Sequence, residues 1–168
     1  MMFRMFLALA LSLALPAAAQ QSDAYPRGKV VIIQLTSSQM VSGFGEYLVP
    51  PLLEALEGTG LVYAFDAEPD YAASIATGSD VGRWVETEDS RDWIYTRSVT
   101  VGLSPADVDI EPGGKPSPSF SVKTILQTPD QDRVDELNCL ISLATRELAA
   151  RYAPKGHFTV NGQGCLRK

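Results

Sequence analysis

Apolar residues recur along the chain with two different periods, and each period predicts one kind of element. The continuous β-branched run KVVIIQL at residues 29–35 suits a strand that is covered on both faces. Within residues 93–103 apolar and polar side chains alternate, which is the period of a strand with one face in water. Turn residues separate such runs, and the predicted strands are residues 29–35, 61–65, 71–76, 82–87, 93–103 and 120–126.

A helical segment should follow the first strand. The Ser/Gly-rich residues 36–45 are expected to form a loop, and the Leu-rich stretch after them ends at Gly58, a residue type typical of helix C-termini. Pro50 and Pro51 each remove a backbone donor and push the preceding residue out of the helical conformation. We therefore expect a helix that is broken at the prolines, with Pro51 opening its second piece.

The clearest helical signal lies near the C-terminus. Thr128 as N-cap, Pro129 at the first helical position and Gln131 three residues after the threonine match a capping box. Pro154 should stop this helix. Its apolar stripe, which should pack on the sheet, consists of Val134, Leu137, Ile141, Ala144, Leu148 and Tyr152.

These elements predict an α+β fold with a mixed, mostly antiparallel sheet of about five to six strands. The broken N-terminal helix and the long C-terminal helix should pack on it. Residues 20–28 are expected to form a flexible N-terminus, and residues 29–168 a single domain with a disulfide-tied tail. Arg97 interrupts the apolar face of its strand, and we expect it at a sheet edge with its charged end in water rather than in a buried binding role.

The first nineteen residues have the pattern of an export signal. Arg4 gives the positive start, residues 5–15 the short apolar stretch, and residues 17–19 the small side chains of a cleavage site before Gln20. Removing nineteen of the 168 residues leaves 149, and no later stretch is apolar enough to span a bilayer. We expect a periplasmic protein in a Gram-negative bacterium and a secreted one otherwise.

The charge of the mature chain narrows its partners. Arg4 is the only charged residue in the signal, so 13 basic side chains face 20 acidic ones and the formal charge is −7. Nucleic acids and anionic lipid surfaces repel such a chain. The expected partner is another envelope protein.

Two cysteines predict one disulfide, Cys139–Cys165. Cys139 points away from the apolar stripe of the last helix, beside Leu143, so residues 155–168 should fold back over this outward face. An even pair of cysteines in an oxidising compartment forms a bridge by default. A redox pair would need closer spacing at a helix start, and zinc would need more ligands than His157 adds.

Few residues offer chemistry, and we expect no catalytic residues, metal or cofactor. His157 is the only histidine, and no nucleophile motif accompanies it. The loop after the first strand lacks the third glycine of a dinucleotide fingerprint and the lysine of a phosphate loop, so it is only a candidate ligand loop. Its residues are Ser37, Ser38, Ser42, Gly43 and Gly45.

The connector at residues 104–119 is long and rich in Pro and Gly, and connections of this length are usually functional or disordered. We take its centre as a candidate interaction loop, made of Asp107, Val108, Asp109, Ile110, Glu111 and Lys115. Asp107, Asp109 and Glu111 alternate like the start of a calcium loop, but Pro112 and Pro118 occupy the Gly and Glu positions. A second acidic cluster, a candidate glycosidic carboxylate pair, contains Glu86, Glu88, Asp89 and Asp92.

The order of the predicted elements resembles that of small periplasmic α/β domains. GTGLVYAF and PDYAASIATG stand where the N-terminal domain of the Tol translocation protein and the anticodon-binding-like domains of envelope lipoproteins place their second and third strands. The similarity covers residues 29–152 and implies a docking module without catalytic residues. The lipoproteins' lipid-attachment cysteine is missing here.

The sequence thus favours a non-enzymatic periplasmic interaction module, an accessory of an envelope assembly or transport system. A periplasmic small-ligand or calcium-binding protein is the alternative, with the ligand at the loop after the first strand. An acidic-pair hydrolase is the third hypothesis.

Overall fold

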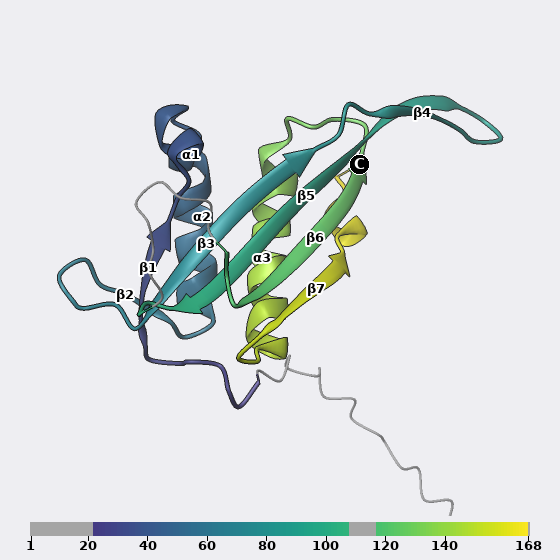
Figure 1. Cartoon of the computed structure of the whole chain (residues 1–168). Helices are drawn as coiled ribbons and strands as arrows, with labels where there is room; N and C mark the ends of the chain where they lie inside the picture. The colour runs from purple at the N-terminus through teal and green to yellow at the C-terminus, as the bar shows by residue number, and fades with distance from the viewer. Residues whose placement is uncertain (1–21, 108–116, 168) are drawn as a thin grey trace, which may run out of the picture.

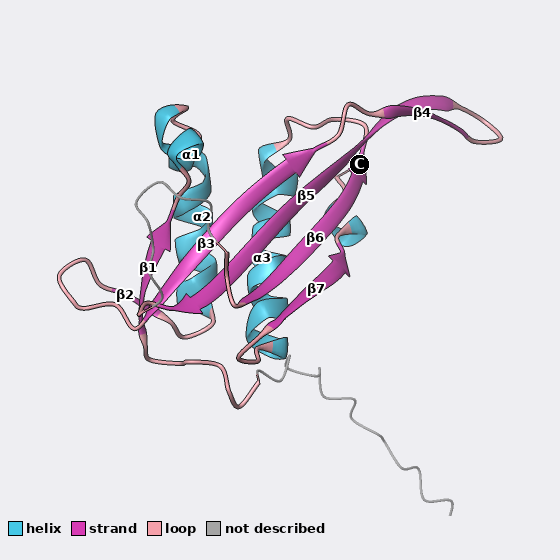
Figure 2. Cartoon of the chain, viewed as in Figure 1, coloured by secondary structure: helices cyan, strands magenta, loops and turns pink. Residues whose placement is uncertain are grey.

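The protein is built from a twisted sheet with two helices on one of its faces (Figures 1 and 2). The computed structural model describes residues 22–107 and 117–167, and every structural statement below refers to them. The elements are β1 (Val30–Gln34), α1 (Ser37–Val41), α2 (Gly45–Gly58), β2 (Val62–Tyr63), β3 (Tyr71–Ser79), β4 (Arg83–Glu86), β5 (Arg91–Pro105), β6 (Phe120–Thr128), α3 (Val134–Arg151), β7 (Gly156–Asn161) and the 3-10 turn η1 (Gln163–Cys165).

The strand order is β2-β1-β3-β5-β6-β7, with β4 paired to the first part of β5. The longest ladders, β3 with β5 and β5 with β6, are antiparallel. The outer pairs are parallel, namely β1 with β2 and β3, and β6 with β7. The sheet is therefore mixed and the α+β prediction is confirmed.

The core lies between the sheet and the helices α2 and α3. Alternate residues of β5 point toward the helices, and Val99, Val101 and Leu103 are fully buried there. Each helix contributes residues at helical spacing to the same core, because only one stripe of a helix can face a sheet. These buried leucines and isoleucine are Leu48, Leu52, Leu56, Leu137, Ile141 and Leu148.

The first helical segment is not broken at Pro50 and Pro51, where we expected the break. Residues 36–45 are not a plain loop: they contain α1, and the chain turns at Gly43 before α2 runs unbroken through Pro50 and Pro51. The prolines lie in the second turn of α2, so the carbonyls that lose their helical partners belong to Glu46 and Tyr47. Both residues are exposed, so water can bind these carbonyls, while Leu packing holds the helix together.

The capping box predicted at Thr128 is also wrong. Thr128 is the last residue of β6, paired with Tyr95, and its hydroxyl accepts the backbone N–H of Asp130 in a turn. The helix begins six residues later at Val134, with Arg133 as N-cap. Strand pairing in the sheet thus prevails over a local motif.

Both ends of the described chain belong to the fold. The expected tail over the outward face of α3 is correct only for the chain end, where η1 and Arg167 contact α3. Residues Gly156–Asn161 instead form β7 beside β6, which adds an edge strand to the sheet. The expected flexible N-terminus is likewise packed from Ser22 on. Tyr25 is buried, its hydroxyl lies 2.6 Å from Thr59 Oγ1, and its ring packs on Tyr152. Burial raises the pKa of Tyr25 to about 12.

Candidate functional site

The hairpin formed by β4 and the start of β5 projects beyond the helices (Figure 1). We call residues 81–95 the hairpin arm. Trp93 and Tyr95 lie on the same side of β5 as Val99 and Val101, the side that the helices cover further along the strand. In the arm this apolar side continues without the helix layer. Trp84 and Trp93 remain 54% and 36% exposed.

The aromatic residues of the arm form an ordered row. Trp84 pairs directly with Trp93, and their ring centroids are 5.2 Å apart in an edge-to-face arrangement. Tyr95 continues the row, with its ring 6.5 Å from that of Trp93. The guanidinium of Arg91 stacks on the ring of Trp84, 4.9 Å from its centroid. Rigid rings that are already held in place lose little conformational entropy when a partner binds to them.

Asp80 fixes the root of the arm. Its Oδ1 accepts the backbone N–H groups of Thr96 at 2.8 Å and of Gly82 at 3.0 Å. These hydrogen bonds, the one from Thr96 first, hold the pKa of Asp80 below its usual range. At the other end, Thr87 and Ser90 close the turn, with a backbone hydrogen bond of 2.8 Å. The arm is therefore fixed at both ends.

The acidic cluster considered for glycosidic chemistry occupies the tip and edges of this arm. Glu86, Glu88, Asp89 and Asp92 are all exposed. Glu86 pairs with Arg91 at 3.5 Å, and Asp92 accepts the hydroxyl of Ser90 at 2.7 Å. Together with Arg83 and Arg91, the four carboxylates give the arm beyond Asp80 a formal charge of −2. The structure places Glu88 and Asp89 in the exposed turn, and Glu86 and Asp92 on the two strands beside it.

Of the candidate interaction loop the structure describes Asp107, which follows the end of β5 that is opposite to the arm. Asp107 is exposed, while Val108, Asp109, Ile110, Glu111 and Lys115 lie outside the described residues, as do two of the three acids of the calcium-like pattern. The ends of the connector are fixed. The N–H of Ser119 donates to Ser104 Oγ at 2.9 Å, and its hydroxyl donates to the carbonyl of Leu103 at 3.1 Å.

The candidate ligand loop forms α1 and the turn into α2. Thr36 and Gln39 make a capping box, and the buried Gln39 amide donates to the carbonyl of Ile75 at 2.9 Å. The glycines have steric roles: Gly43 has a φ of +71°, and a Cβ on Gly45 would lie 2.7 Å from Leu35 Cδ1. The structure brings Ser37, Ser38, Ser42, Gly43 and Gly45 together around this short helix.

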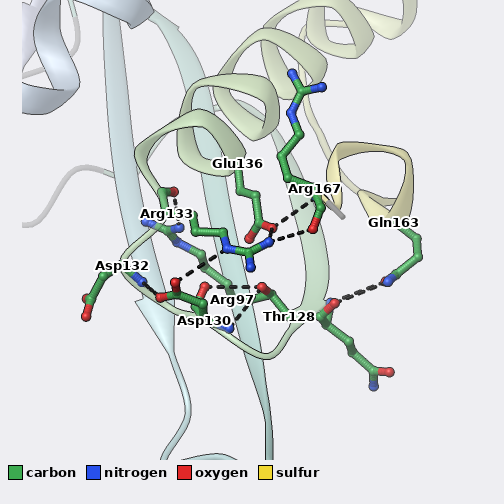
Figure 3. A network of polar contacts seen from close by, with 9 residues as sticks. Arg97, Thr128, Asp130, Asp132, Arg133, Glu136, Gln163 and Arg167 are labelled. Atoms are coloured by element: carbon green, nitrogen blue, oxygen red, sulfur yellow. Dashed lines mark hydrogen bonds and ion pairs between the residues drawn. The ribbon is translucent and has the colours of Figure 1, made fainter.

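Arg97 lies in the middle of the sheet, which corrects the expected edge position. It stands on β5 between β3 and β6, half-buried under the start of α3, and donates from Nη1 to the carbonyl of Arg133 at 2.7 Å. Figure 3 shows the polar network around it. Buried Glu136 accepts from Arg133 Nη1 at 3.3 Å and from the Arg167 N–H at 3.2 Å, while its second oxygen has no partner among residues 22–107 and 117–167.

The disulfide joins Cys139 to Cys165, as predicted. It connects α3 to η1, so the tail that carries β7 is fixed at its far end. His157 is exposed on β7, and its Nδ1 lies 2.8 Å from Ser121 Oγ. This contact has no orienting carboxylate among the described residues, which a Ser–His mechanism would need.

The described residues contain no cluster of His, Cys, Asp or Glu that could hold a metal ion. None of their helices has the length and hydrophobicity needed to cross a bilayer. The fold defines an α+β domain with a projecting aromatic hairpin. Comparisons with protein-family models and with curated proteins find no match. We therefore infer its function from its own residues.

Proposed function

We propose that this chain is a non-enzymatic protein-binding module of the cell envelope, periplasmic in a Gram-negative bacterium, and that the hairpin arm is its docking surface. The carrying observation is the row formed by Trp84, Trp93 and Tyr95, which continues the core side of β5 past the end of the helix layer. Trp, Tyr and Arg are the residue types that dominate binding energy at interfaces. The disulfide supports an oxidising compartment.

The charge of the arm specifies its partner. Four carboxylates lie at the tip and along the strands of the arm and outnumber its two arginines, one of which, Arg91, stacks on Trp84. A complementary surface is an apolar recess with Lys and Arg at its rim, because opposite charges steer two proteins together. A second copy of this acidic chain would place like charges against each other. We therefore infer that the partner is a different envelope protein.

Site-specific photo-crosslinking in intact cells tests this proposal. A benzophenone amino acid at Trp84 should give one discrete adduct with an envelope protein. The matched control is the same amino acid at Phe65, which is 89% exposed in the loop after the edge strand β2. Equal adducts from both positions, no adduct from position 84, or an adduct with the chain itself would each contradict the proposal.

Binding of the purified partner gives the second test. Trp84→Ala and Trp93→Ala should each weaken the affinity at least about tenfold, as expected for interface hot spots. Phe65→Ala should leave it unchanged. Added salt should slow association with the partner, because it screens the attraction between the negatively charged arm and a positively charged partner surface. If neither tryptophan variant loses affinity while circular dichroism shows an intact fold, the arm is not the docking surface.

A further inference from the structure

A cleft of about 420 Å³ lies between the first turns of α2 and α3, at the carboxyl end of β3. This space is separate from the hairpin arm. Its walls are mostly apolar: Phe44 is the N-cap residue of α2, Tyr47 lies in its first turn, and Val134 and Leu137 come from α3. Arg97, from the centre of the sheet, supplies its cationic group. A concave apolar site with few polar groups is the usual form of a small-molecule site, and this volume falls within its range.

Arg97 is incompletely paired for a guanidinium in such a place. Its hydrogen-bond partner among the described residues is the carbonyl of Arg133, and it takes part in no ion pair there. A guanidinium carries five N–H donors in a planar fork that matches a carboxylate. Burial lowers the pKa of Arg97, although the carboxylates of Glu136, Asp132 and Asp130 act to raise it. An anion in the cleft would complete its pairing.

The walls define the rest of the ligand. The rings of Phe44 and Tyr47 lie 6.5 Å apart, and Phe44, Tyr47 and Val134 are 37%, 63% and 52% exposed. These side chains leave apolar area uncovered beside a cation. Asp132 also lines the cleft, and its carboxylate repels any anion, so every negative charge beyond the one that pairs with Arg97 is unfavourable. The geometry therefore favours one negative charge attached to an apolar body.

We propose that this cleft binds small monocarboxylates with an aromatic or aliphatic body. The carboxylate pairs with the Arg97 guanidinium, and the body lies against Phe44, Tyr47 and Val134. A free organic acid and the C-terminus of a short peptide share this chemistry. This inference uses none of the residues of the hairpin arm, so the two proposals can fail separately.

Titration of the purified mature protein, followed by NMR and calorimetry, tests the inference. The probes are 3-phenylpropanoate, its neutral amide, and acetyl-Ala-Ala-Phe with a free or an amidated C-terminus. Each carboxylate should bind at least about tenfold more tightly than its amide, as expected for a charge-assisted pair. Shifted resonances should come from Phe44, Tyr47 and Val134. Tighter binding of the peptide would identify a chain end, and tighter binding of 3-phenylpropanoate a free acid.

Two variants locate the site. Arg97→Gln should remove the preference for the carboxylate over the amide, whereas Arg146→Gln, on the exposed side of α3, should keep it. Tyr47→Ala changes an exposed ring, so it should leave the fold intact and weaken both probes together. Equal binding of acid and amide to the unmodified protein, absence of binding, or shifts confined to residues outside the cleft would each overturn the inference.

Discussion

The indole of Trp93 lies directly on the backbone of Gly82. A Cβ added at Gly82 would come within 2.2 Å of Trp93 Nε1, and Gly82 has a φ of +78°, which side-chain-bearing residues rarely adopt. The same glycine donates its N–H to Asp80 at the root of the arm. Gly82 therefore sets both the bend of the chain and the position of the tryptophan.

Gly82→Ala should displace Trp93 and lower the free energy of unfolding by about 1–3 kcal/mol, the cost of backbone strain at such a position. Tryptophan fluorescence and near-UV circular dichroism should both change. Gly58→Ala is the matched control, because nothing lies within 4 Å of its added Cβ and its backbone is helical. It should be neutral or slightly stabilising. Equal effects of the two substitutions would contradict the role of Gly82.

The sequence was informative wherever hydrophobic periodicity decided the structure. The alternation in β5 and the apolar stripe of α3 were visible, because side-chain direction follows directly from the period of a strand or a helix. The two strands of the hairpin arm were expected as well, at residues 82–87 and 93–103. That its aromatic side extends past the helix layer was not visible, because this depends on where α3 begins relative to the sheet.

Apart from the helix break expected at Pro50 and Pro51, the errors share one cause, namely contacts between residues that are distant in the sequence. Thr128 has a capping-box pattern, yet its pairing with Tyr95 keeps it in β6. β7 forms by parallel pairing with β6, and no local turn signal announces such a strand. Arg97 looked like an edge residue because its strand's central position depends on the whole strand order. Its place in the cleft was therefore missed.

Removing the disulfide should loosen the edge of the sheet and leave its centre intact. The bridge spans 26 residues. For the double variant Cys139→Ser with Cys165→Ser, the chain-entropy relation predicts a free energy of unfolding that is lower by about 3.5 kcal/mol. Hydrogen exchange should accelerate in β7 and η1, which the bridge holds, and stay slow in β5. Reduction of the unmodified protein should reproduce the pattern. Equally fast exchange in β5 would mean that the bridge supports the whole core.

Glu136 should support the same tail one turn of α3 before Cys139. It is fully buried and accepts hydrogen bonds from Arg133 and from the N–H of Arg167. Glu136→Ala should cost about 2–3 kcal/mol by denaturant unfolding, less than for a fully buried pair, because Arg133 is 34% exposed. Asp135→Ala, its exposed neighbour, should cost less than about 1 kcal/mol. Similar losses would show that Glu136 has no special role.

Tyr25 should make the protein sensitive to alkali. Burial raises the pKa of Tyr25 to about 12, whereas a tyrosine in the unfolded chain ionises near pH 10. The unfolded state therefore loses the proton first, so stability is fully present below about pH 10 and falls as the pH rises toward about 12. Burial raises the pKa of Tyr152 to about 12 as well, so both phenols act in the same direction.

Denaturant unfolding at stepwise pH values measures this dependence. Tyr25→Phe should cost about 1 kcal/mol at neutral pH, since it loses the hydrogen bond to Thr59, and should make the alkaline decline shallower. Tyr63→Phe, at an exposed position on β2, should leave the decline unchanged. The remaining slope in Tyr25→Phe should come from Tyr152. An identical alkaline decline in the unmodified protein and in Tyr25→Phe would show that the Tyr25 phenol ionises without unfolding the N-terminal segment.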